Sequence, residues 1–314
     1  MDVALALLLA SSVIIACWIY HKLSRRGTLG PRGETGNNML GWREPIALAT
    51  THYAVFALDG EWGRSRLTTE RLVVYIHGIG GHLGQLTWGV DGGLARALVE
   101  AGYTVLAVDL YGHGFTDAPD SNHKPGEFVD QVRALLQRLR VTEPFDLVAF
   151  SHGCFIASAY AAEEPRMVKR LVLNSPFGCD VPFHSTRVVA GLAALVVHLF
   201  FEGNMSQLRT IFRLFLHMEG PRLAAWVKKI DATPIEVLLV AGTRDCDPVL
   251  RILQTARRLH AALARSVLHV TPGGVHMTWA TGSPTQQRDF RKLLLGFLGS
   301  GAAAPMTPPL GPDT

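Results

Sequence analysis

The stretch that decides the fold is FDLVAFSHG, residues 145–153. Its first six residues, Phe145–Phe150, form a short apolar run that predicts a buried strand, and Cys154–Glu164 has the composition of a helix. Ser151 lies on the turn between them, with small residues two positions before and after it. A nucleophilic serine on a strand-to-helix turn needs such neighbours because the backbone is crowded there. Alone, a serine at a strand-to-helix junction is more often a helix N-cap than a nucleophile, so the rest of the chain has to decide.

The chain on both sides repeats this alternation of strand and helix. An early strand is predicted over His52–Leu58. Stronger strands are predicted over Leu72–Ile76, Thr104–Leu110, Arg170–Leu173, Ile235–Ala241 and Val267–Val270, and helices over Gly93–Ala101, Glu127–Arg140, Val249–Ala264 and Phe290–Leu298. Short apolar strands separated by helices imply an α/β fold with a mostly parallel central sheet and helices on both faces. The predicted domain covers residues 51–298, which is long enough to bury a large core.

One segment, about residues 178–234, interrupts the alternation without a strand signal. A structureless loop of that length would be unusual, so we expect an inserted helical cap. Its first part, Val188–Phe201, is almost continuously apolar. This stretch is explained either by a helix packed over the sheet or by an apolar lid over a lipid-binding pocket.

The N-terminus contains an 18-residue run, Val3–Tyr20, that is almost entirely apolar and has the minimum length of a transmembrane helix. Positive charge follows the run at Lys22–Arg26, which favours a retained anchor over residues 1–21, although a cleaved secretory signal is the alternative. The positive-inside rule would then place the following domain on the cytosolic side. Residues 22–50 are predicted to be a linker and residues 299–314 a disordered tail.

The composition excludes several classes of protein. The net charge of +4 is mild, so it does not indicate nucleic-acid binding and fits an anionic membrane surface better. The four cysteines form no C-x-x-C pair, which argues against a disulfide scaffold or a zinc cluster. The glycine-rich stretch after the first strong strand has Leu83 where a dinucleotide fingerprint needs a small residue. We therefore expect no cofactor and no metal.

Two residues later in the chain are the candidate partners of Ser151. A serine hydroxyl needs an adjacent base, and the base needs an orienting acid. Asp245 follows the strand predicted over Ile235–Ala241, and His276 lies in a glycine-rich loop after the last strand. The order serine, acid, histidine suits a nucleophile elbow. Asp247 is the rival acid, although its place before a proline also suits a helix cap.

The segment HGIGG, residues 77–81, follows the first strong strand and supplies a candidate oxyanion hole. Its glycines leave backbone amides free to point into a cavity. We expect the amides of Ile79 and His152 to bind the negative oxygen of a tetrahedral intermediate. The side chain of His77 is expected to tie loops together.

These motifs together resemble the α/β-hydrolase superfamily over about residues 70–298. They include DLYGHG, residues 109–114, which is similar to a structural turn of that family. A serine at the elbow differs from family members that use aspartate there, and Thr281 stands where acyltransferase-like relatives carry the aspartate of a His-x4-Asp motif. Among the groups of the superfamily, the chain looks most like membrane-anchored monoacylglycerol lipase-like hydrolases.

That resemblance implies hydrolysis of a lipophilic ester, of the monoacylglycerol or lysophospholipid type, through an acyl-enzyme. Two alternatives remain open at this point. One is a thioesterase or amidase that uses the same three residues, and the other is a membrane-tethered scaffold with little activity.

Overall fold

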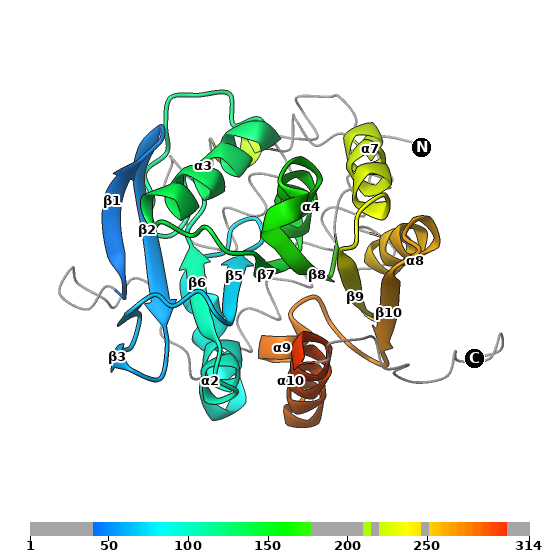
Figure 1. The fold of residues 1–314 in the computed structure, drawn as a ribbon. Helices are drawn as coiled ribbons and strands as arrows, with labels where there is room; N and C mark the ends of the chain where they lie inside the picture. The colour runs from blue at the N-terminus through cyan, green and yellow to red at the C-terminus, as the bar shows by residue number, and fades with distance from the viewer. Residues whose placement is uncertain (1–39, 177–209, 215–219, 246–250, 300–314) are drawn as a thin grey trace, which may run out of the picture.

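The computed structural model describes residues 40–176, 210–214, 220–245 and 251–299. These residues build one mixed sheet with the strand order β10-β9-β8-β7-β5-β6-β2-β4-β3, and β1 pairs with β2 (Figure 1). The strands are β1 Trp42–Ile46, β2 Ala49–Phe56, β3 Gly60–Glu61, β4 Arg64–Ser65, β5 Leu72–Ile76, β6 Thr104–Val108, β7 Phe145–Phe150, β8 Val168–Asn174, β9 Glu236–Gly242 and β10 Ser266–Thr271.

The six strands from β10 to β6 run parallel, and β2 joins β6 in the antiparallel direction. This arrangement confirms the predicted mostly parallel sheet. Strands β5 and β7 have the predicted bounds, and β6, β8, β9 and β10 differ from theirs by one to two residues at an end.

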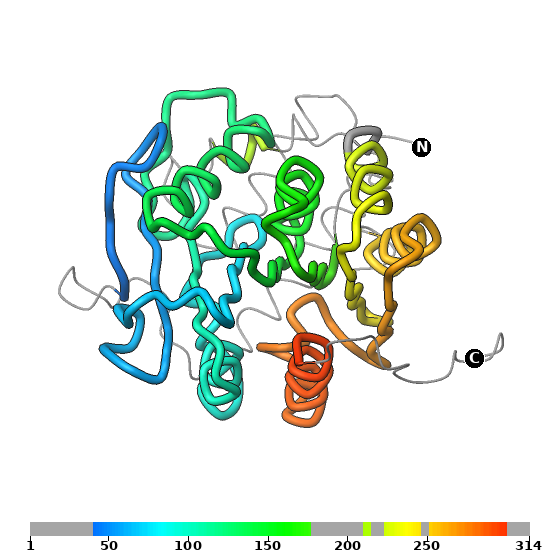
Figure 2. Tube along the Cα trace, in the orientation of Figure 1, coloured from blue at the N-terminus to red at the C-terminus, as the bar shows by residue number. Residues whose placement is uncertain are grey.

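Helices cover both faces of the sheet (Figure 1). One face carries α3 Pro125–Arg138, α4 His152–Glu163, α7 Gly220–Asp231 and α8 Ile252–Ala262; the other carries α2 Gly93–Glu100, α9 Thr278–Thr281 and α10 Pro284–Gly299. Figure 2 shows that α2 and α10, which come from distant parts of the chain, lie side by side.

Alternation along each strand supplies a core on both sides of the sheet. In β5, Val74 and Ile76 face the cluster around α3 and α4, and Val73 and Tyr75 face the cluster around α2 and α10. Successive side chains of a strand point to opposite faces, so a strand covered on both sides must be apolar throughout. That requirement explains why the strands appear in the sequence as continuous apolar runs.

Two predicted boundaries are wrong. The linker expected over residues 22–50 is too long, because Trp42–Ile46 forms β1 and pairs with β2. The cap expected over residues 178–234 is also too long, because α7 packs against α4 and buries Leu223, Val227 and Ile230 in the core beside the sheet. A short helical stretch at 210–214 is the other described part of that insertion.

The predicted anchor over residues 1–21 and the stretch 300–314 of the predicted tail lie outside the described residues. Within the described ranges, no helix combines the length and the apolar character that crossing a bilayer demands. The apolar stretch Val188–Phe201 also lies outside them.

Candidate active site

Ser151 lies on a strained turn between β7 and α4, as the sequence predicted. Its backbone has φ 53° and ψ −122°, a combination that residues with a Cβ atom seldom adopt. The turn is held by a hydrogen bond from the Ser151 amide to the Asn174 carbonyl, 2.9 Å long. A Cβ atom on Gly153 would come within 2.6 Å of the carbonyl oxygens of Ile76 and His77. This close approach to the backbone of β5 explains why a glycine stands two positions after the serine.

The structure brings Ser151, His276 and Asp245 together. His276 Nε2 lies 2.9 Å from Ser151 Oγ, and His276 Nδ1 lies 2.6 Å from Asp245 Oδ1. The Nδ1–H group donates to the carboxylate, which leaves the Nε2 lone pair to accept the serine proton. The arrangement can therefore remove a proton from the Ser151 hydroxyl. The rival acid, Asp247, lies outside the described residues.

These three residues meet because they follow the carboxyl ends of β7, β9 and β10, which share one edge of the sheet. The loops after β9 and β10 are packed backbone to backbone. The Arg244 amide donates to the Gly274 carbonyl at 2.9 Å, and a Cβ atom on Gly242 would lie 2.1 Å from that same oxygen. Close packing of the two loops fixes the distance between the acid and the histidine.

The two amides predicted to form an oxyanion hole follow the carboxyl ends of the neighbouring strands β5 and β7, at the same edge of the sheet. His152 is the first residue of α4, so its amide has no acceptor within the helix and lies at the positive end of the helix dipole. Ile79 follows Gly78, where a Cβ atom would lie 2.9 Å from Ser151 Cβ. Among the described residues, no acceptor contacts the Ile79 amide.

Three histidine side chains are buried close to the candidate oxyanion hole, and burial lowers the pKa of each. The pKa of His77 falls to about 3 and that of His113 to about 4, while His152, next to His113, also falls to about 3. His77 Nε2 accepts the Leu110 amide at 3.0 Å, and its Nδ1–H donates to the Gly78 carbonyl at 2.7 Å. This confirms the prediction that His77 ties loops together. All three imidazoles are neutral at physiological pH.

Asp109 holds neighbouring loops in place through its carboxylate, a role that could not be seen in the sequence. Its Oδ1 accepts the Leu83 amide at 2.6 Å, and its Oδ2 contacts His52 Nδ1 at 2.6 Å. The other ring nitrogen of His52 contacts the Leu40 carbonyl, so the imidazole lies between two acceptors. Burial alone would raise the pKa of Asp109, but the hydrogen bond and charge of His52 outweigh it and lower the pKa to about 2.

The sequence analysis also missed Ser175, which follows β8. Its hydroxyl oxygen lies 2.6 Å from Asp245 Oδ2. A polar residue at the carboxyl end of a buried parallel strand was the available signal, because the same rule had found Asp245.

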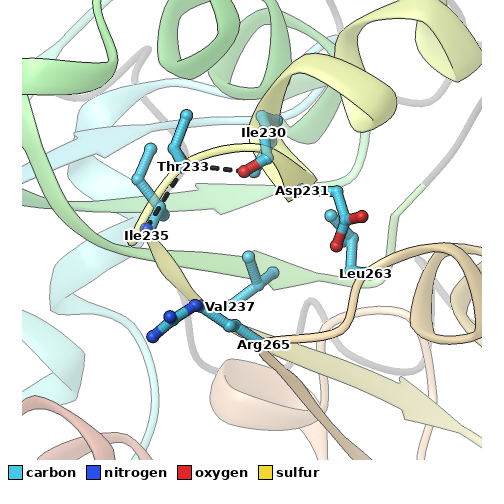
Figure 3. Close-up of a pocket in the computed structure, with 7 residues that line it drawn as sticks. All are labelled: Ile230, Asp231, Thr233, Ile235, Val237, Leu263 and Arg265. Carbon is cyan, nitrogen blue, oxygen red and sulfur yellow. Dashed lines mark hydrogen bonds between the residues drawn. The ribbon is translucent and has the colours of Figure 1, made fainter.

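A small surface gap lies at the opposite edge of the sheet, where β9 and β10 begin (Figure 3). Figure 3 shows Thr233 bridging this turn by accepting the Ile235 amide and donating to the Ile230 carbonyl. Its lining residues are Ile230, Asp231, Thr233, Ile235, Val237, Leu263 and Arg265. Because this gap lies at the amino ends of the strands, it is separate from the site around Ser151. Among the described residues, no group of three or more potential ligands could hold a metal ion.

Comparisons with known proteins agree with the fold described above. A family model described as "alpha/beta hydrolase fold" matches residues 71–211. A solved structure of the meta-cleavage product hydrolase CumD from Pseudomonas fluorescens IP01 superposes with a TM-score of 0.62 at 22% sequence identity, covering 83% of this chain and 98% of that one. The chain has the α/β-hydrolase fold.

The names of two curated relatives indicate an activity of those proteins. Pyrrolizixenacetamide deacetylase of Xenorhabdus hominickii is 37% identical over 105 residues, which cover 33% of this chain and 37% of that protein. The probable lysophospholipase BODYGUARD 1 of Arabidopsis thaliana is 36% identical over 85 residues, 26% of this chain and 18% of that protein. The chain spans only 18 to 37% of the length of these relatives.

Proposed function

We propose that this protein is a serine hydrolase that cleaves a carboxylic ester through an acyl-enzyme. The observation that carries the proposal is the continuous hydrogen-bonded series from Ser151 through His276 to Asp245. Three side chains from distant parts of the chain meet within hydrogen-bonding distance at the edge of the sheet. The strained backbone at Ser151 is consistent with a functional role, because such conformations are frequent at active sites.

In the first half of the reaction, His276 takes the proton of Ser151 while the serine oxygen attacks the acyl carbonyl. The amides of Ile79 and His152 stabilise the negative oxygen of the tetrahedral intermediate, each contributing about 3 kcal/mol. His276 then gives its proton to the departing alcohol. In the second half, the same imidazole activates a water molecule, which releases the acid and frees the serine.

We propose a lipophilic ester, such as a monoacylglycerol or a lysophospholipid, as the substrate. Three observations support this choice: the apolar run Val3–Tyr20, the apolar run Val188–Phe201, and the similarity to a probable lysophospholipase. An anchor over residues 1–21, with the hydrolase domain on the cytosolic side, would hold the enzyme at a membrane where such lipids partition.

Hydrolysis of an amide or a thioester is the second candidate, because the same three residues can form an acyl-enzyme from either. Similarity to a protein named as a deacetylase favours including it. Competition between matched ester, thioester and amide substrates of one acyl chain separates these candidates. If the protein is an esterase, the ester should have the highest kcat/KM of the three substrates after correction for the intrinsic reactivity of each bond.

The test of the proposal compares wild-type protein with Ser151→Ala and Ser158→Ala. Ser158 is a matched control, because it is a buried serine in the same helix whose hydroxyl donates to the Cys154 carbonyl at 2.8 Å. We expect a fluorophosphonate probe to label the wild type and Ser158→Ala. In Ser151→Ala, labelling should disappear and hydrolysis of short-chain and lipid esters should fall by roughly 10⁴-fold or more. Full labelling of folded Ser151→Ala would refute the assignment.

A further inference from the structure

Ser175 contacts both residues that stand behind Ser151. Its hydroxyl oxygen lies 2.6 Å from Asp245 Oδ2 and 3.0 Å from the carbonyl oxygen of His276. Its own amide donates to the Val240 carbonyl at 2.7 Å. One buried residue at the end of β8 therefore joins the ends of β9 and β10, where the acid and the histidine lie.

The hydroxyl carries one proton and faces two acceptors, so it can donate fully to only one of them. The carboxylate is closer and charged, and hydrogen bonds to charged acceptors are about twice as strong as those between neutral groups. The proton therefore goes to Asp245 Oδ2. Within the described ranges, His276 is then the donor at Oδ1 and Ser175 the donor at Oδ2.

Burial makes the second donor important. The Asp245 side chain is 0% exposed, so water does not replace a missing hydrogen bond. Among the described residues, Ser175 is the donor to Oδ2. Without it, this buried oxygen would lose the donor that the described part of the chain gives it, and the carboxylate would be held less firmly against rotation about its Cβ–Cγ bond.

The backbone conformation points in the same direction. Ser175 has φ 52°, which is unfavourable for a residue with a Cβ atom. A glycine would adopt this φ without that penalty. The backbone alone therefore does not explain a serine at this position, whereas its hydroxyl does.

We propose that Ser175 is a positioning residue that holds Asp245 with Oδ1 toward His276 and neutralises part of the carboxylate charge. The inference rests on the proposed function. In hydrolysis, the negative charge of Asp245 has to stabilise the imidazolium that forms when His276 takes the serine proton. By fixing the carboxylate, Ser175 acts on the reaction through Asp245 and His276.

The test uses the full chain and the variants Ser175→Ala and Ser175→Gly, with Ser158→Ala as the control. The glycine variant relieves the unfavourable φ, so a loss of activity there is not explained by backbone strain. For both Ser175 variants we expect kcat to fall by about 10- to 100-fold, as for one lost hydrogen bond to a charged group, with KM nearly unchanged. The acid limb of the pH–rate profile should move to higher pH, because more negative charge then faces His276.

A second readout does not depend on turnover. The proton between His276 Nδ1 and Asp245 gives a downfield NMR resonance, and it should shift or broaden in both Ser175 variants and stay in place in Ser158→Ala. The proposal requires both the kinetic change and the NMR change. When the wild type is active, either change alone, or values like those of the control, would overturn it. If the wild type hydrolyses no ester, the proposed function fails, and the positioning role is decided by the resonance alone.

Discussion

The buried histidines predict that this protein loses stability in mild acid, and His113 allows the effect to be isolated. Its Nδ1–H donates to the Tyr111 carbonyl at 2.9 Å, and its side chain is fully buried. Burial lowers the pKa of His113 to about 4, against about 6.5 in an unfolded chain, although the Tyr111 carbonyl and Asp109 partly oppose the shift.

The direction in which pH changes the free energy of unfolding follows from proton linkage. Between pH values of about 6.5 and 4, the unfolded chain holds a proton on this imidazole and the folded chain does not. The contribution to stability is therefore fully present above about pH 6.5 and is lost as the pH falls toward 4. One proton changes the free energy of unfolding by about 1.4 kcal/mol per pH unit, so His113 accounts for roughly 3 kcal/mol across this window. The lowered pKa values of His77 and His152 act with the same sign.

The measurement is urea unfolding, followed by the fluorescence of the protein at several pH values, for the wild type and His113→Asn. An asparagine amide keeps the donor to the Tyr111 carbonyl but does not titrate. We expect the variant to be less stable at neutral pH because it loses packing. As the solution is acidified, however, its free energy of unfolding should fall by about 1.4 kcal/mol less per pH unit than that of the wild type. His260→Asn is the control, because His260 is exposed. Parallel stability curves for the wild type and His113→Asn would refute the reasoning.

Two further variants test how the site is held in place. Asp109→Asn replaces one of the two buried carboxylate oxygens, which accept the Leu83 and Phe115 amides, by an NH2 group that cannot accept, so we expect the free energy of unfolding to fall by about 1–3 kcal/mol; unchanged stability in urea unfolding would contradict this role of Asp109. Gly242→Ala would put a methyl group 2.1 Å from the Gly274 carbonyl, so ester hydrolysis should fall with stability. Gly126→Ala, whose methyl group meets nothing within 4 Å, should leave activity unchanged, and equal activity of the two variants would argue against the loop contact.

Much of the fold could be predicted from the sequence because its signals are local. The run Phe145–Phe150 is apolar except for Asp146, as expected for a strand buried on both faces, and β7 has the same bounds. The turn at Ser151 could be recognised because a glycine, Gly153, stands two positions after it. A Cβ atom at this glycine would come within 2.6 Å of carbonyl oxygens at the end of β5. Asp245 and His276 could be proposed because both follow strands that end at the same edge of the sheet.

The predicted boundaries failed where contacts over long distances decide. The segment Trp42–Ile46 has no strong strand pattern, but it becomes a strand by pairing with β2 at the end of the sheet. Helix α7 lies in the long segment that shows no strand signal in the sequence. Only its packing against α4 assigns it to the layer beside the sheet.

The sequence by itself determined where the parallel strands lie along the chain, the turn at Ser151 and the three candidate residues, since each depends on a few neighbouring positions. Only the tertiary structure decided that Ser175 donates to Asp245, 70 residues away, and that Asp109 pairs with His52, 57 residues away. Such contacts depend on strand order and register. A serine or histidine has the same local pattern whether or not another strand places a carboxylate beside it.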